Sequence, residues 1–124
     1  DGRNSLPAFK RFQKRFCRPD GALGERELWG YNHNPGWIMP FTGPGYFVAY
    51  EQGPHEVLID YMRLPPHGAP GWPSVRPNSA RLSRFIYHGT RDTLRGVSKH
   101  VTIGRAARAG KDMPNWFVLC REGA

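Results

Sequence analysis

Residues 45–52 (GYFVAYEQ) and 55–66 (HEVLIDYMRLPP) are two β-rich runs joined by Gly53-Pro54. Aromatic and β-branched residues favour strands, and the Gly-Pro step between them favours a turn, so the two runs predict a β-hairpin. In the second run, Val57, Ile59 and Tyr61 alternate with residues that face the other way. Because neither face is fully polar, we expect a strand that is covered on both sides or that lines a cavity.

The segment at the N-terminal side of this hairpin predicts an amphipathic helix over residues 5–17. Phe9, Phe12 and Phe16 recur at a helical spacing along one face, and basic residues occupy the rest of the surface. Ser5 can cap the helix, and Pro7 lies in the first turn, where its missing N–H costs nothing. We expect the Phe stripe to dock on the sheet; the alternative is a helix that binds a membrane surface or a polyanion.

Three further segments complete the predicted sheet. Residues 81–88 (RLSRFIYH) and 116–120 (WFVLC) have strand character, and a turn is expected at 109–112. Residues 90–106 fit both a helical and a strand period, and Gly96 in their middle favours the strand. The prediction is therefore an α+β fold in which the N-terminal helix packs on a curved antiparallel sheet of about five strands, shaped as a small barrel or an open cup.

Size and composition are consistent with one loop-rich domain spanning residues 1–124. The chain can bury a single core, and its 15 Gly and 12 Pro leave little room for long regular elements. No apolar run approaches the roughly 20 residues that a transmembrane helix needs, so no transmembrane segment is expected. The sequence does not predict where in the cell the protein acts, or its oligomeric state.

The net charge of +8 is concentrated in two basic segments. Residues 1–19 hold six basic residues and one acid, and residues 81–111 hold eight basic residues and one acid, whereas the middle of the chain is acidic. Such a distribution is typical of a solvated surface with internal charge complementarity. The alternative is that the basic segments present two faces to a polyanion.

Residues 29–45 (WGYNHNPGWIMPFTGPG) combine the Gly and Pro of a loop with an unusual number of aromatic side chains. Apolar walls with a few convergent polar groups are how small-ligand sites are built, so this stretch is expected to roof a pocket. The alternative is that its aromatic residues plug one end of a barrel or sandwich. The predicted ligand-binding residues are Trp29, Asn32, Trp37, Phe41 and Trp72.

If the protein catalyses a reaction, the residues at hand favour proton transfer. His33 or His88 is the expected acid or base, Asp60 the orienting carboxylate, and Tyr31 or Tyr61 the hydrogen-bond donor. The five histidines show no metal-binding spacing, so neither a metal nor a cofactor is predicted.

The leading functional hypothesis is a domain that binds, and in one version transforms, a small apolar or aromatic molecule in this pocket. The rival is a nucleic-acid-binding or assembly module that uses residues 3–18 and 81–111 for phosphates and exposed aromatic residues for base stacking. A third hypothesis is a structural subunit that wraps a partner.

Cys17 and Cys120 lie near opposite ends of the sequence and outside any metal-binding spacing. A disulfide between them would close a long loop and stabilise the chain, whereas two buried thiols are equally ordinary. We expect the two cysteines to be close in space whether or not they are bridged.

Overall fold

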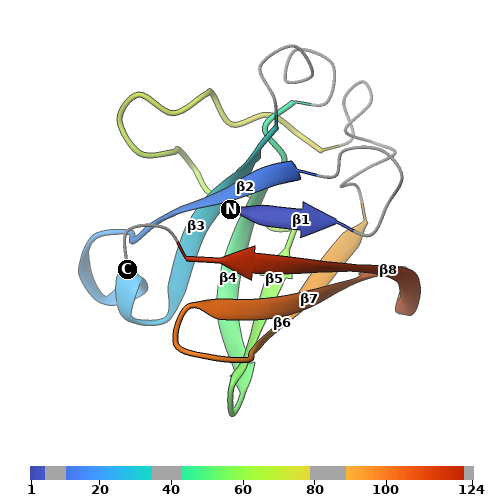
Figure 1. Ribbon diagram of the computed structural model, residues 1–124. Helices are drawn as coiled ribbons and strands as arrows, with labels where there is room; N and C mark the ends of the chain where they lie inside the picture. Colours follow the sequence, from blue (N-terminus) through green and yellow to red (C-terminus); the bar gives the residue numbers. More distant parts are fainter. Residues whose placement is uncertain (5–10, 35–42, 79–88, 122–124) are drawn as a thin grey trace.

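The computed structural model describes residues 1–4, 11–34, 43–78 and 89–121, and shows eight antiparallel strands closed into a barrel (Figure 1). Each strand pairs with its neighbours in the sequence, and β1 also pairs with β8. The strands are β1 (Gly2–Asn4), β2 (Arg11–Cys17), β3 (Glu27–His33), β4 (Tyr46–Gly53), β5 (Glu56–Asp60), β6 (Thr90–Gly96), β7 (Val101–Arg108) and β8 (Lys111–Cys120).

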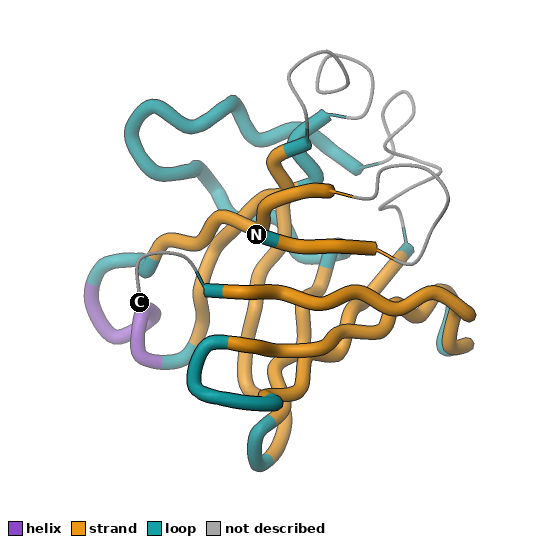
Figure 2. Tube along the Cα trace, in the orientation of Figure 1, coloured by secondary structure: helices purple, strands orange, loops and turns teal. Residues whose placement is uncertain are grey.

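The predicted α+β class with an N-terminal helix is wrong. Residues 11–17 form strand β2, which pairs with β1 and β3, and the one helical element of the described residues is the short 3-10 helix η1 (Gly21–Glu25) (Figure 2). Phe12 and Phe16 are four residues apart, a spacing that places them on one face of a strand as well as of a helix. Pairing with two neighbouring strands supplies the backbone hydrogen bonds that a helix would make locally.

The number of strands was also underestimated. Residues 90–106, which fit two periods, form β6 and most of β7, two strands separated by the turn at 97–100. Strand β3 starts at Glu27, before the aromatic stretch, and ends inside it at His33. Strand β1 closes the barrel by pairing Gly2 with both Phe12 and Leu119. Closure removes the exposed edges that an open sheet of about five strands would have left.

The hairpin predicted from residues 45–66 is confirmed. Strand β4 pairs with β5 in antiparallel register from Val48 opposite Asp60 to Gly53 opposite Glu56. Ile59 and Tyr61 are buried in the core, and Val57 packs against it, as the alternation predicted. The predicted strand at 81–88 lies outside the described residues.

Three phenylalanine rings fill the barrel interior, and each lies on a glycine of the adjacent strand. Gly2 is registered opposite Phe12, and Gly104 opposite Phe117. The third pair is Gly30 and Phe47. A Cβ at any of these glycines would come within 2.5 Å of the partner ring. The interior of an eight-stranded barrel is just wide enough to be filled by side chains. The glycines, which have no side chain, therefore make room for the three large rings.

The turn between β7 and β8 contains a strained residue. Arg108 pairs with Lys111, so Ala109 and Gly110 form a two-residue loop, and both have positive φ (52° and 78°). This conformation belongs to the type I′ hairpin turn, in which a residue with a Cβ is disfavoured by roughly 1–2 kcal/mol.

We expect Ala109→Gly to raise the free energy of unfolding by about 1 kcal/mol, because it relieves this strain. Ala107→Gly, in the neighbouring strand, is the matched control and should lower it by about 0.5–1 kcal/mol. Urea denaturation of both variants measures the two changes. Equal destabilisation by both substitutions would show that Ala109 carries no strain.

The two cysteines are free. The side chain of Gln13 donates a hydrogen bond to Asp1, whose backbone carbonyl accepts one from Cys120. Cys17 lies four residues further along β2 than Gln13, which is roughly 13 Å of strand. No disulfide joins the two cysteines, and they lie at different levels of the barrel. The prediction that they are close in space is therefore wrong.

Candidate functional site

Four polar side chains meet inside the barrel. Lys14 comes from β2, Asn32 from β3 and Asp92 from β6, while Tyr61 directly follows β5. Each lies on the inward side of the alternating strand pattern, and the side chains of Lys14 and Asp92 are only 3% and 7% exposed. We call these four residues the polar cluster.

Every proton of the Lys14 ammonium group has an acceptor in the polar cluster. Its Nζ lies 2.8 Å from Asn32 Oδ1, 2.5 Å from the Tyr61 hydroxyl oxygen and 3.2 Å from Asp92 Oδ2. The Tyr61 hydroxyl donates to Asp92 Oδ2 over 3.2 Å and accepts from Asn32 Nδ2 over 2.8 Å. The second Asn32 N–H bond goes to the carbonyl oxygen of Gly45. The three ionisable groups are thus joined in one hydrogen-bonded network.

Burial acts on the two charged members in opposite directions. Removal from water lowers the pKa of Lys14, and the nearby Asp92 carboxylate partly offsets this effect. Removal from water likewise raises the pKa of Asp92, against the attraction of Lys14 and the Tyr61 hydrogen bond. The charge on each group therefore depends on the other, and a proton can move between them at smaller cost than in water.

Aromatic rings surround the Lys14 ammonium group. Its Nζ lies 5.1–5.6 Å from the ring centroids of Phe12, Phe47, Tyr61 and Phe117. A cation held over the faces of several rings gains a favourable electrostatic contact that water does not supply. The polar cluster is therefore an isolated polar site within an apolar, aromatic interior.

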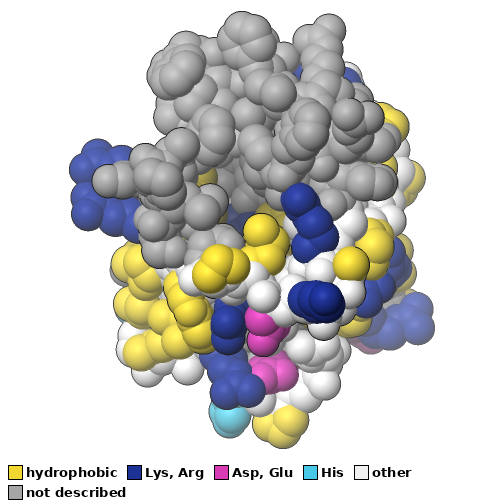
Figure 3. All heavy atoms as spheres, turned by 90° about the vertical axis from the view of Figure 1, so that its right-hand side faces the viewer, with side chains coloured by type: hydrophobic (Ala, Val, Ile, Leu, Met, Phe, Trp, Pro, Cys, Tyr) yellow, Lys and Arg dark blue, Asp and Glu magenta, His cyan; other side chains and the backbone are white. Residues whose placement is uncertain are grey.

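The polar cluster lies toward one end of the barrel, which we call the loop end. Strands β1, β3, β5 and β7 end there and β2, β4, β6 and β8 begin there, because neighbouring strands are antiparallel. Asn32 and Tyr61 are next to the strand ends, whereas the apolar core around Ile59 and Leu94 continues toward the opposite end. Figure 3 turns the right-hand side of Figure 1 toward the viewer, and the described part of this face shows basic and acidic side chains beside apolar ones.

The predicted site residues divide between the two sides of the barrel wall. Tyr61 and Asn32 belong to the polar cluster inside. Trp29 and Tyr31 alternate with Asn32 along β3 and point outward, although both are buried, at 7% and 2% exposure. His33 shares their outer side, in edge contact with Tyr31. Residues adjacent in the sequence are thus separated by the sheet.

The outward aromatic residues are covered by the Pro-rich segment that follows β5. Trp72 from this segment packs on Tyr31 and Tyr46, at centroid distances of 4.9 and 6.5 Å, and His67 packs on Trp29. We call these residues the outer aromatic cluster: Trp29, Tyr31, Tyr46, His67 and Trp72. Its contacts account for the burial of Trp29 and place Trp72, a predicted ligand-binding residue, against the outside of the barrel wall.

On this outer side, the pKa values of Tyr46 and His33 are shifted toward the neutral forms of the two side chains. Burial, with smaller effects of Tyr31 and Cys17, raises the pKa of Tyr46 to about 12, and its hydroxyl donates to the Pro73 carbonyl oxygen. Burial and the positive charge of Arg15 lower the pKa of His33. Neutral His33 can accept a proton, and its ring lies in edge contact with Tyr31 at a centroid distance of 6.3 Å.

Asp60 has a local structural role in the described chain. Its Oδ1 accepts a hydrogen bond from the Met62 backbone N–H over 2.9 Å, and its Oδ2 lies 3.6 Å from Arg91 Nε. A carboxylate that binds the backbone two residues on stabilises a turn. His88, Trp37 and Phe41 lie outside the described residues, and the described ones contain no group of His, Cys, Asp and Glu suited to a metal ion.

Sequence reasoning missed Lys14 and Asp92. The signal was present, because Lys14 lies midway between Phe12 and Phe16, so a strand would put all three on one face. Asp92 likewise precedes Leu94 by two residues. The helical interpretation of residues 5–17 assigned Lys14 to a solvated face and concealed this pattern.

No protein-family model matches the chain, and no curated protein or solved structure is significantly similar to it. Among the described residues there is also no helix long and apolar enough to span a bilayer.

Proposed function

We propose that the barrel binds a small, largely apolar or aromatic molecule at its loop end, with the polar cluster holding the one polar group of that ligand. The observation that carries the proposal is the buried Lys14–Asp92 ion pair. Burying two charges costs several kcal/mol each, and apolar replacements of such pairs are often neutral or stabilising. Stability alone thus gives little reason for the protein to retain this ion pair, and its retention favours a role in function.

The ligand class follows from the surroundings of the pair. Eight-stranded barrels can hold one small ligand, and barrel mouths are common ligand sites. The rings around Lys14 suit an apolar or aromatic body. Lys14 and Tyr61 supply N–H and O–H donors for a carbonyl, carboxylate or hydroxyl oxygen that replaces one of their present acceptors. If the ligand is transformed, the same groups and Asp92 supply the proton-transfer chain.

A thermal-shift panel of small apolar and aromatic molecules, each with one oxygen acceptor, tests this proposal. A ligand present at 100 times its Kd should stabilise the parent protein by about 2.7 kcal/mol through mass action. The Lys14→Met/Asp92→Leu double variant should lose this shift, because it removes the polar group and keeps the shape of the interior.

Trp72→Phe is the matched control, because it alters the outer aromatic cluster and leaves the polar cluster intact. It should keep the shift. If Trp72→Phe abolishes ligand binding while the double variant preserves it, the ligand lies outside the barrel wall. If no compound in the panel shifts the parent, the proposed function is rejected for this ligand class.

A further inference from the structure

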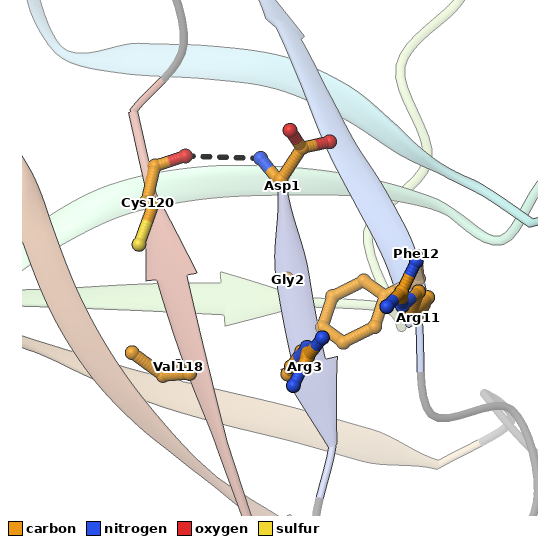
Figure 4. A pocket seen from close by; sticks show the side chains of 7 residues that line it. All are labelled: Asp1, Gly2, Arg3, Arg11, Phe12, Val118 and Cys120. Carbon is orange, nitrogen blue, oxygen red and sulfur yellow. Dashed lines mark hydrogen bonds between the residues drawn. The ribbon is translucent and has the colours of Figure 1, made fainter.

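An open groove of about 440 Å³ crosses the outer side of β1. It differs from the proposed ligand site inside the barrel, because it is exposed and lined by charged side chains. Figure 4 shows Arg3 of β1 and Arg11 of β2 at this groove, with Val118 of β8 on the other side of β1. The ring of Phe12 lies under Gly2, whose missing side chain opens the wall there. The groove thus has an apolar floor at Phe12, two arginines on its β1–β2 side and the apolar Val118 on its β8 side.

Arg3 and Arg11 are directly opposite each other in the β1–β2 register, and both are exposed. Side chains at such positions start about 5 Å apart, and like charges there destabilise the sheet. Among the described residues neither guanidinium forms an ion pair. The acid that lines the groove, Asp1, accepts a hydrogen bond from Gln13. An anion between the two arginines would remove their repulsion.

An exposed aromatic side chain continues the same outer face. Val118 is registered opposite Arg3, so Trp116, two residues away on β8, is the diagonal neighbour of Arg3 at roughly 7–8 Å. Trp116 is 47% exposed, and the Arg105 guanidinium of β7 lies 4.9 Å from its ring centroid. Arg105 also approaches Asp112, at 3.6 Å. Residues from both basic segments of the sequence therefore meet on the face formed by β7, β8, β1 and β2.

From this arrangement we infer that the β8–β1–β2 face binds single-stranded nucleic acid. Arg3 and Arg11 contact successive backbone phosphates, and Trp116 stacks on an adjacent base. Planar guanidinium groups bind phosphate oxygens in a bidentate manner, and an exposed ring stacks on any base that is not already paired. A duplex offers the phosphates but hides the base faces, so stacking at Trp116 selects the single strand.

Fluorescence anisotropy with a labelled oligothymidylate of about 16 nucleotides, at several salt concentrations, tests the inference. The parent should bind at low salt with affinity that falls as salt rises. Each phosphate contact on a single strand contributes about 0.7 to the log–log salt slope, so Arg3→Gln/Arg11→Gln should reduce the slope by about 1.4. Arg3→Lys/Arg11→Lys should retain most of it.

The matched control is Arg63→Gln/Arg95→Gln, which removes the same charge from arginines that already pair with Glu27 and Glu56. It should leave the salt slope unchanged. Trp116→Ala should weaken single-strand binding by about fivefold to a hundredfold without altering the slope.

Three results would overturn the inference. The first is no binding of the oligonucleotide at low salt. The second is an equal loss of slope in the Arg3/Arg11 and Arg63/Arg95 variants, which would indicate attraction by overall charge alone. The third is equally tight binding of a duplex of the same length with no effect of Trp116→Ala.

Discussion

Lys14→Met is expected to lower the free energy of unfolding by about 3–5 kcal/mol, because it leaves the Asp92 carboxylate buried without its cation. Methionine fills nearly the same volume between the Phe47 and Phe117 rings, so little of this loss should come from packing. Asp92 would keep the Tyr61 hydroxyl as a donor, which is too little to replace an ammonium group at 3.2 Å. Urea denaturation monitored by tryptophan fluorescence measures the change.

The Lys14→Met/Asp92→Leu double variant is the control for this prediction. It removes both charges, so its stability should return to that of the parent or exceed it by about 1–4 kcal/mol. A double variant less stable than the parent protein would show that the pair contributes net stability, and it would weaken the functional reason for its retention.

The Lys14→Met variant should also depend on pH in a predictable direction. Burial raises the pKa of Asp92 above its ordinary 3.8, and loss of the lysine removes an interaction that opposes this rise. Between the ordinary and the raised pKa, the folded chain binds more protons than the unfolded chain, so stability falls as pH increases. The deficit of the variant relative to the parent should therefore be smaller near about pH 5 than near about pH 8. If the stability deficit of Lys14→Met grows as pH falls, the pKa of the buried Asp92 carboxyl group is not raised in the variant.

The second large effect is expected at the pair of Phe117 and Gly104. Phe117→Ala should cost about 3–5 kcal/mol, because the ring is 7% exposed and packs edge-on against Phe12. Gly104→Ala should cost about 1–3 kcal/mol on its own, since its Cβ would lie 2.2 Å from Phe117 Cζ. All its close neighbours are side-chain atoms.

The double variant Phe117→Ala/Gly104→Ala should therefore be more stable than the sum of the two losses predicts, with a coupling of about 0.5–3 kcal/mol. Gly30 provides the contrast, because a Cβ there would lie 2.5 Å from the backbone carbonyl oxygen of Arg15 as well as from Phe47. Gly30→Ala should stay destabilising in a Phe47→Ala background. Additive losses at Gly104 would mean that the ring does not occupy the space above that glycine.

Part of the candidate site could be predicted from the sequence. The alternation of Val57, Ile59 and Tyr61 placed Tyr61 on the inner face, and the position of Asn32 in an aromatic stretch marked it as a candidate. The other members of the site could not be predicted in the same way. Residues 29–45 were treated as one loop over a pocket, but residues 29–33 belong to strand β3, along which successive side chains face opposite sides of the sheet. Trp29 and Asn32 were therefore expected in one pocket, and the barrel wall separates them.

The sequence by itself determined the β4–β5 hairpin and the strand-turn-strand character of the C-terminal third, because short-range turn chemistry and alternation specify both. Only the tertiary structure decided that residues 11–17 are a strand. Phe12 and Phe16 satisfy both a helical and a strand period, and the competing hydrogen bonds come from β1 and β3. Closure through β1 and β8 joins residues more than a hundred positions apart, which no local pattern encodes. Because the barrel is closed, Lys14 lies inside it as the buried partner of Asp92, and not on the surface as the sequence predicted.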